Sequence, residues 1–92
     1  MRRGEPGRAG DEMVTGWKQI SNKWYYFESS GVMVTGWKQI SDKWYYFESS
    51  GVMQTGWQKI SGKWYYFYES GEMAVSTTIG SYVIDENGVW TP

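Results

Sequence analysis

The sequence lacks two residue types on which most active sites and metal centres depend, because it contains no cysteine and no histidine. Their absence excludes disulfide bonds, thiol chemistry, a histidine general base and most transition-metal sites. The remaining residues show no recognisable pairing of a nucleophile with a base and no carboxylate pair in an evident cleft. We therefore expect no catalytic activity, no metal site and no cofactor.

The sequence also lacks a charge excess and any long apolar run. Nine Lys and Arg residues against ten Asp and Glu residues give a formal net charge of −1 at pH 7. Nucleic-acid binding requires a basic surface, so no nucleic-acid partner is expected. No apolar stretch reaches the length of a transmembrane helix. No signal peptide is recognisable, so we expect a secreted form to have lost its leader, or the chain to be a fragment of a longer protein.

Aromatic residues are abundant instead. They make up 20% of the 92 residues and include seven Trp and eight Tyr. A chain this short builds only a small core, and this aromatic content exceeds what such a core needs. The excess indicates stacking surfaces, either between structural units or toward a ligand.

The aromatic residues recur with a fixed period of 20 residues. Residues 16–35 read GWKQISNKWYYFESSGVMVT, residues 36–55 differ from them at two positions, and residues 56–75 keep the same register. Such a period is typical of a repeat array, in which each unit contacts mainly its neighbours.

Both ends of the array are atypical. Residues 76–92 are predicted to be a degenerate C-terminal cap, as terminal units of repeat arrays often are. The whole repeat module is predicted to span residues 13–92. The Gly-, Arg- and Pro-rich residues 1–12 are predicted to be a disordered tail, or a remnant that does not belong to the module.

Each repeat is expected to form a β-hairpin. In the first repeat, residues 17–20 and 23–27 are short runs rich in β-forming residues, separated by Ser21-Asn22. The second turn position holds Asn, Asp or Gly in the three repeats, and these residues tolerate the positive φ of a two-residue turn. Side chains alternate along a strand. The hairpin therefore has two faces, one with Trp17, Trp24 and Tyr26 and the other with Ile20, Tyr25 and Phe27.

Stacking is needed to stabilise such hairpins, since an isolated hairpin is marginal in water. Scarce helix formers and recurrent glycines disfavour a helical alternative. The predicted fold is therefore an all-β solenoid of stacked hairpins. Its open ends would expose apolar faces, so a homodimer formed through these ends is one expectation, and the sequence leaves the oligomeric state open.

The pattern TGWxxIxxKWYYFxxSGxM, at residues 15–33, 35–53 and 55–73, resembles the choline-binding repeat, also called the cell-wall-binding repeat. This family occurs in surface proteins and lytic enzymes of Gram-positive bacteria and their phages. The resemblance implies a left-handed superhelix of hairpins. It also implies a secreted or cell-wall-associated module that attaches non-covalently to choline-bearing teichoic or lipoteichoic acid.

The resemblance further implies choline sites between successive repeats. In each site, the two tryptophans come from one repeat, the second tyrosine of Trp-Tyr-Tyr comes from the next, and the Gly-x-Met methionine lies nearby. Two complete sites follow: Trp17, Trp24 and Tyr46 with Met33, and Trp37, Trp44 and Tyr66 with Met53.

A third site would use Trp57 and Trp64. The next unit offers Val83 or Ile84 where the tyrosine is expected, so this third site is predicted to be weak or absent.

These residue types suit a quaternary ammonium ligand. A trimethylammonium group donates no conventional hydrogen bond, and the faces of electron-rich rings attract its charge. Each ring contributes about 0.5–2 kcal/mol, so a single site is expected to bind at roughly millimolar concentration. Tandem sites on a polymer with many choline groups compensate by avidity.

Two alternatives stay open from the sequence. Related repeats that bind glucan-type carbohydrates look similar, although they more often lack the Trp directly before Tyr-Tyr, and aromatic faces also stack on sugars. The array could instead be a structural or protein-binding spacer, in which the same tryptophans and methionines are core residues that fill space between repeats.

Overall fold

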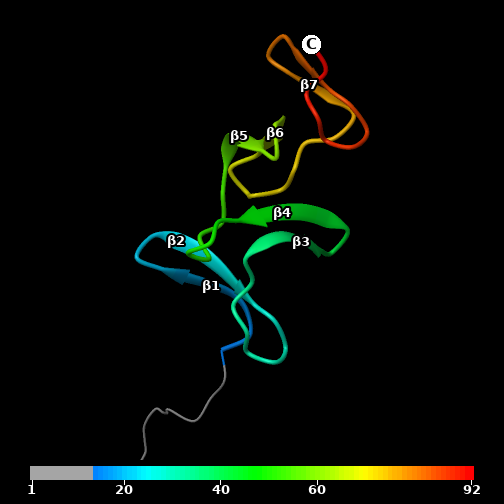
Figure 1. Cartoon of the computed structure of the whole chain (residues 1–92). Coiled ribbons are helices and arrows are strands. Elements are labelled where there is room, and N and C mark those ends of the chain that lie inside the picture. The colour runs from blue at the N-terminus through cyan, green and yellow to red at the C-terminus, as the bar shows by residue number, and fades with distance from the viewer. Residues whose placement is uncertain (1–13) are drawn as a thin grey trace, which may run out of the picture. The chain divides into compact units, whose positions relative to one another are not determined.

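The computed structural model describes residues 14–92, which form eight β-strands and no helix (Figure 1). The predicted tail, residues 1–12, lies outside the described residues. The strands pair into four antiparallel hairpins. These are β1 (Gly16–Ile20) with β2 (Lys23–Phe27), β3 (Gly36–Ile40) with β4 (Lys43–Phe47), β5 (Gly56–Ile60) with β6 (Lys63–Phe67), and β7 (Thr77–Ile79) with β8 (Tyr82–Ile84). The all-β prediction is confirmed.

The chain divides into two compact units, Met1–Val34 and Thr35–Pro92. The first unit holds the hairpin β1–β2, and the second holds the three hairpins that run from green to red in Figure 1. No helix in residues 14–92 is long and apolar enough to cross a membrane.

The hairpin turns have the predicted two residues and the predicted register. Trp17 lies opposite Tyr26, and Gln19 lies opposite Trp24. The turn residue Ser21 has a φ of 53°, and the residue after it has a φ of 67°. Two positive φ angles define the mirror-image turn whose twist matches that of the paired strands.

Each hairpin continues into a loop that folds back onto its second strand. In the third repeat, the Tyr68 N–H donates to the Glu72 carbonyl at 2.9 Å and the Ala74 N–H donates to the Tyr66 carbonyl at 2.8 Å. A β-bridge joins Phe67 to Met73 at the end of this loop. The returning segment is therefore fixed beside β6 and carries the methionine to a defined position.

In the second unit, backbone hydrogen bonds connect the loops that follow the third and fourth hairpins to the hairpin of the preceding repeat. The Met73 N–H donates to the Trp44 carbonyl at 2.8 Å, and the Trp90 N–H donates to the Trp64 carbonyl at 2.9 Å. These bonds confirm the predicted stacking of successive hairpins within this unit. The left-handed sense of the superhelix stays a prediction.

The core of the second unit repeats with the sequence. Phe47 and Phe67 are fully buried, and Ile84 is 1% exposed. Each of them is the last residue of its hairpin's second strand. Burying a side chain of this size contributes about 1.5–3 kcal/mol, so one large apolar residue per repeat supplies much of the stabilisation.

Two loop glycines, Gly71 and Gly88, let their loops pack on the methionine of the preceding repeat. Gly88 has a φ of +83°, and a Cβ atom added there would come 2.5 Å from the Met73 Cε atom. Gly62, in a hairpin turn, has nearly the same φ of +81° but has no atom within 4 Å of such a Cβ.

We expect Gly88→Ala to destabilise the second unit more than Gly62→Ala does. Both substitutions place a side chain at positive φ, which costs about 1–2 kcal/mol. Only Gly88→Ala also requires the end of the Met73 side chain to move, because the added Cβ would lie within 3 Å of its Cε and Sδ atoms. Urea unfolding of the two variants measures the difference in the free energy of unfolding. Equal losses would show that Met73 moves aside without cost.

A second prediction concerns alkaline pH. Burial raises the pKa of the Tyr45 hydroxyl above its ordinary value of 10.0, and the negative charge of Glu72 raises this pKa further. The folded state therefore holds this proton more tightly than the unfolded state. Its contribution to stability is complete below about pH 10 and is lost as the pH rises through the folded-state pKa.

We therefore expect Tyr45→Phe to gain stability relative to the unmodified chain as the pH rises above about 10. Urea unfolding at a series of pH values from neutral to alkaline measures this difference. Tyr68→Phe, which changes a tyrosine that is 40% exposed, is the control. Stability curves for Tyr45→Phe that stay parallel to those of the unmodified chain would contradict the prediction.

Candidate ligand-binding site

The second unit contains two cavities walled by aromatic side chains at equivalent places in the repeat. The first, which we name the middle pocket, has a volume of about 360 Å³ and is lined by Trp37, Trp44, Tyr65, Met73 and Asn87. The other, which we name the C-terminal pocket, has a volume of about 260 Å³ and is lined by Trp57, Trp64, Tyr82 and Trp90.

The middle pocket is built on Trp37. Its ring centroid lies 6.3 Å from that of Trp44 at an interplanar angle of 81°, and 4.9 Å from that of Tyr65 at 68°. Steeply angled rings form the walls of a corner and do not close the space between them. Trp37 is 37% exposed and Trp44 is 40% exposed, so their faces remain accessible to a ligand.

Strand alternation explains which side chains meet in this pocket. In the hairpin β3–β4, Trp44 lies opposite Gln39, and Gln39 lies on the same face as Trp37 because side chains alternate along a strand. Trp37 and Trp44 therefore share one face of this hairpin. In the next hairpin, β5–β6, Tyr65 and Phe67 share the face that does not carry the tryptophans. Phe67 also reaches Trp37, at 5.8 Å between ring centroids. In the second unit the hairpins β3–β4 and β5–β6 therefore stack head to tail, with the tryptophan face of one against the Tyr-Phe face of the next.

The tyrosine that this stacking brings to the second expected site is not the one that was predicted. Tyr66 was expected to complete the cage with Trp37 and Trp44, but it contacts Trp57 of its own hairpin at 5.2 Å. Tyr66 shares a face with Trp57, and that face points away from the preceding hairpin. The adjacent residue Tyr65 takes the expected place.

The methionine of the second site also differs. Met53 was expected to line the pocket, but its side chain packs beneath Gly71. Met73, one repeat later, lines the middle pocket. The backbone bond from Met73 to the Trp44 carbonyl gives the reason, since it brings the loop of the following repeat to the tryptophan.

The C-terminal pocket corrects the expectation that no ring follows Trp57 and Trp64. The Tyr82 ring lies 5.4 Å from that of Trp57, at an interplanar angle of 78°. Trp90 lies 5.8 Å from Tyr82, at 81°, and adds a fourth aromatic wall.

The register of the last hairpin shows why those rings were missed. A β-bridge joins Ile84 to Trp90 in the same way that one joins Phe67 to Met73. Tyr82 is therefore the equivalent of Tyr65, two residues before the bridge. Val83, the expected replacement, is 51% exposed and lies outside the pocket, while Ile84 is buried in the core. Aligning Gly88-Val89-Trp90 with the Gly-x-Met motif would have identified both rings.

The first expected site draws residues from both units. In the first unit, the Trp17 ring lies 6.2 Å from Trp24 and 5.1 Å from Tyr26. Tyr46, in the second unit, contacts Trp37 of its own hairpin at 5.2 Å. Met33 is 37% exposed in the first unit. The assembly of Trp17, Trp24, Tyr46 and Met33 into one site stays a prediction.

The chemistry of both pockets is that of a binding site for a compact cation or an apolar group. None of the lining residues is an acid, a lysine or an arginine. Among residues 14–92 there is no group of three or more His, Cys, Asp or Glu residues that could hold a metal ion. Ring faces are the principal binding elements, and Asn87 adds one amide to the middle pocket.

Comparisons with known proteins agree with this architecture. The sequence profile of the choline-binding repeat matches residues 14–37 and 34–77. No curated protein matches the chain significantly.

Solved structures resemble the chain over most of its length. Choline binding protein F from Streptococcus pneumoniae, solved in the presence of a peptidoglycan analogue, is 51% identical with a TM-score of 0.84, over 86% of this chain and 27% of that protein. The choline binding domain of Spr1274 from the same organism is 45% identical with a TM-score of 0.80, over 86% of this chain and 96% of that domain. The multimodular pneumococcal endolysin from phage Cp-1, complexed with choline, is 33% identical with a TM-score of 0.74, over 89% and 27% respectively. The chain thus spans about a quarter of the length of choline binding protein F and of the endolysin.

Proposed function

The chain belongs to the choline-binding repeat family, and on that premise we propose that it is a non-enzymatic module that binds choline groups of a bacterial cell-wall polymer. The observation that carries this proposal is the presence of two pockets whose walls are aromatic rings at steep angles. The proposed natural ligand is choline-bearing teichoic or lipoteichoic acid, and the proposed location is the cell surface or cell wall.

Ring geometry favours a cation over a sugar. A quaternary ammonium group is round and attracts ring faces from several sides at once, so angled walls can all contribute. A sugar stacks on one flat face, and the rings that line the two pockets meet at 68–81° rather than lying parallel to one another. The endolysin from phage Cp-1, solved with choline, shares this fold and supports the same ligand class.

The number of pockets fits attachment to a polymer. Each ring contributes about 0.5–2 kcal/mol, so each pocket by itself binds weakly. Two pockets in one unit that engage neighbouring groups of the same polymer raise the overall affinity by effective concentration. A weak, multivalent and non-covalent attachment follows, and it requires no catalysis by this chain.

We expect choline chloride to raise the melting temperature of the chain in a saturable way at millimolar concentration. A ligand that binds only the folded state stabilises it by about 2.7 kcal/mol at one hundred times its dissociation constant. Differential scanning calorimetry measures the shift, with sodium chloride at equal ionic strength as the control. Trp64→Ala should lose part of the shift, because Trp64 lines the C-terminal pocket and is 38% exposed.

Tyr68→Ala provides a matched variant, since Tyr68 is an equally exposed aromatic residue that lines neither pocket. Glucan oligomers form the third arm of the experiment. Stabilisation by glucans and not by choline would replace the proposed ligand with a carbohydrate. Stabilisation by neither ligand would leave the repeats with a structural role.

A second experiment identifies the tyrosine of the middle pocket. Tyr65→Leu should weaken choline binding there by roughly two- to thirtyfold, the contribution of one ring. Tyr66→Leu should leave the affinity of this pocket nearly unchanged, because Tyr66 packs on Trp57. The indole NMR signal of Trp44, assigned by its loss in Trp44→Phe, reports on the middle pocket in each titration. The opposite order of effects would restore the second tyrosine as the ligand contact.

A further inference from the structure

The third repeat exchanges two residues relative to the first two. The first strand of the hairpin reads Gly-Trp-Lys-Gln-Ile in the first and second repeats and Gly-Trp-Gln-Lys-Ile in the third. Lys59 therefore occupies the place that Gln39 occupies in the second repeat. Because side chains alternate along a strand, this exchange moves a positive charge from one face of the hairpin to the other.

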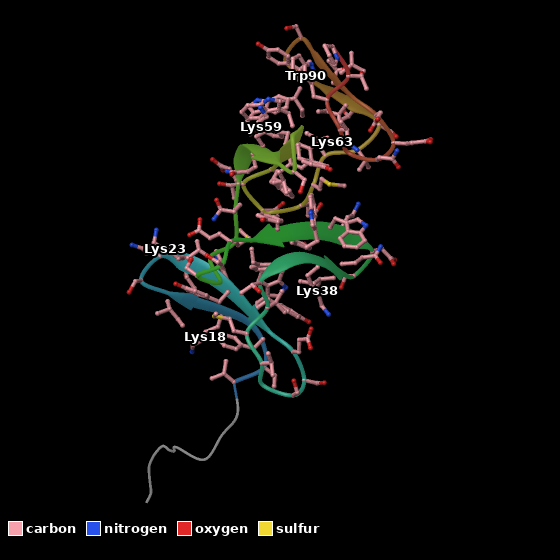
Figure 2. The ribbon with its side chains drawn as sticks, in the orientation of Figure 1. Lys18, Lys23, Lys38, Lys59, Lys63 and Trp90 are labelled. Atoms are coloured by element: carbon pink, nitrogen blue, oxygen red, sulfur yellow. The ribbon has the colours of Figure 1, made fainter. Side chains whose placement is uncertain are left out.

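The register places this charge on the face that carries the C-terminal pocket. Lys59 lies directly opposite Trp64, so the two side chains leave the hairpin on the same side with their Cβ atoms about 5 Å apart. Trp57 and Trp64 of this face line the pocket, and Lys59 is exposed beside them. Figure 2 labels Lys59 and Lys63 on this hairpin and Trp90 on the segment that follows β8.

Nothing in the described part of the chain neutralises this ammonium group. Among residues 14–92, the Lys59 side chain forms no hydrogen bond and no ion pair. The protein as a whole has a formal net charge of −1 and therefore gives no general attraction for anions. A positive charge beside a cation-binding pocket repels a ligand that is only a cation. It attracts the anionic group of a ligand in which a short spacer joins a cation to an anion.

We propose that Lys59 makes the C-terminal pocket selective for a zwitterion, in which trimethylammonium enters the aromatic walls and a phosphate on the adjoining spacer pairs with the Lys59 ammonium. This inference rests on the proposed function, because it assumes that the pocket holds a quaternary ammonium group. The middle pocket has Gln39 opposite Trp44 and lacks this feature. The two pockets thus differ in ligand preference, with phosphocholine favoured over choline at the C-terminal pocket.

The test is a pair of NMR titrations of the full chain with choline and with phosphocholine. The indole signal of Trp90, assigned by its loss in Trp90→Phe, reports on the C-terminal pocket, and that of Trp44 reports on the middle pocket. We expect phosphocholine to bind the C-terminal pocket about threefold more tightly than choline at low salt, as exposed ion pairs allow. This preference should shrink as sodium chloride is added, because salt screens exposed charges.

Three variants isolate the contribution of Lys59. Lys59→Gln, which installs the residue of the second repeat, should abolish the preference at Trp90 while choline binding is retained or improved. Lys59→Arg should keep the preference. Lys63→Gln removes an equal charge from the opposite face of the same hairpin, where Lys63 pairs with Ile60, and should leave the preference unchanged.

The outcomes separate this inference from the proposed function. Binding of neither ligand at either indole signal would overturn the proposed function itself. If choline binds but both indole signals show the same preference for phosphocholine, only the role of Lys59 would be overturned. The same holds if the preference at Trp90 survives in Lys59→Gln. Equal gains for both ligands in Lys59→Gln would also overturn it, since they would show that the lysine itself covers the Trp64 ring.

Discussion

Head-to-tail stacking of hairpins is the constraint on which the rest of this structure depends. A β-hairpin has two different faces, and in the second unit the tryptophan face of one hairpin meets the Tyr-Phe face of the next. The backbone bond from the Met73 N–H to the Trp44 carbonyl holds this arrangement, and the bond from Trp90 to Trp64 repeats it. The same stack therefore builds the core and leaves a pocket at equivalent places in successive repeats.

The division between core and pocket follows from distance along the strand. Phe67 ends its strand and is fully buried, whereas Tyr65, two residues earlier on the same face, has its ring at the wall of the middle pocket. Trp37 contacts both rings. Stability and ligand binding thus share one residue, which explains why a chain with so small a core carries so many aromatic side chains. Rings held by packing lose little conformational freedom when a ligand enters.

The two pockets are not copies of one another. The C-terminal pocket has Trp90 where the middle pocket has Met73, and it is the smaller of the two. A tryptophan ring offers a cation a fixed electron-rich face, while a methionine side chain is flexible and weakly polar. The short terminal hairpin, which looks degenerate beside the full repeats, therefore supplies both a buried residue, Ile84, and two pocket walls.

The sequence by itself determined the hairpins, because turn chemistry and strand alternation are local: the pairing of Trp17 with Tyr26 was predictable from the Ser21-Asn22 turn alone. It also determined that the paired tryptophans share a face. Which residues of the next repeat meet them depends on how one hairpin rotates and shifts against another, and neighbouring residues such as Tyr65 and Tyr66 have identical side chains. Only the tertiary structure decided between them, since the hydrogen bonds that set the stacking join backbone groups 26 and 29 residues apart and do not depend on residue type.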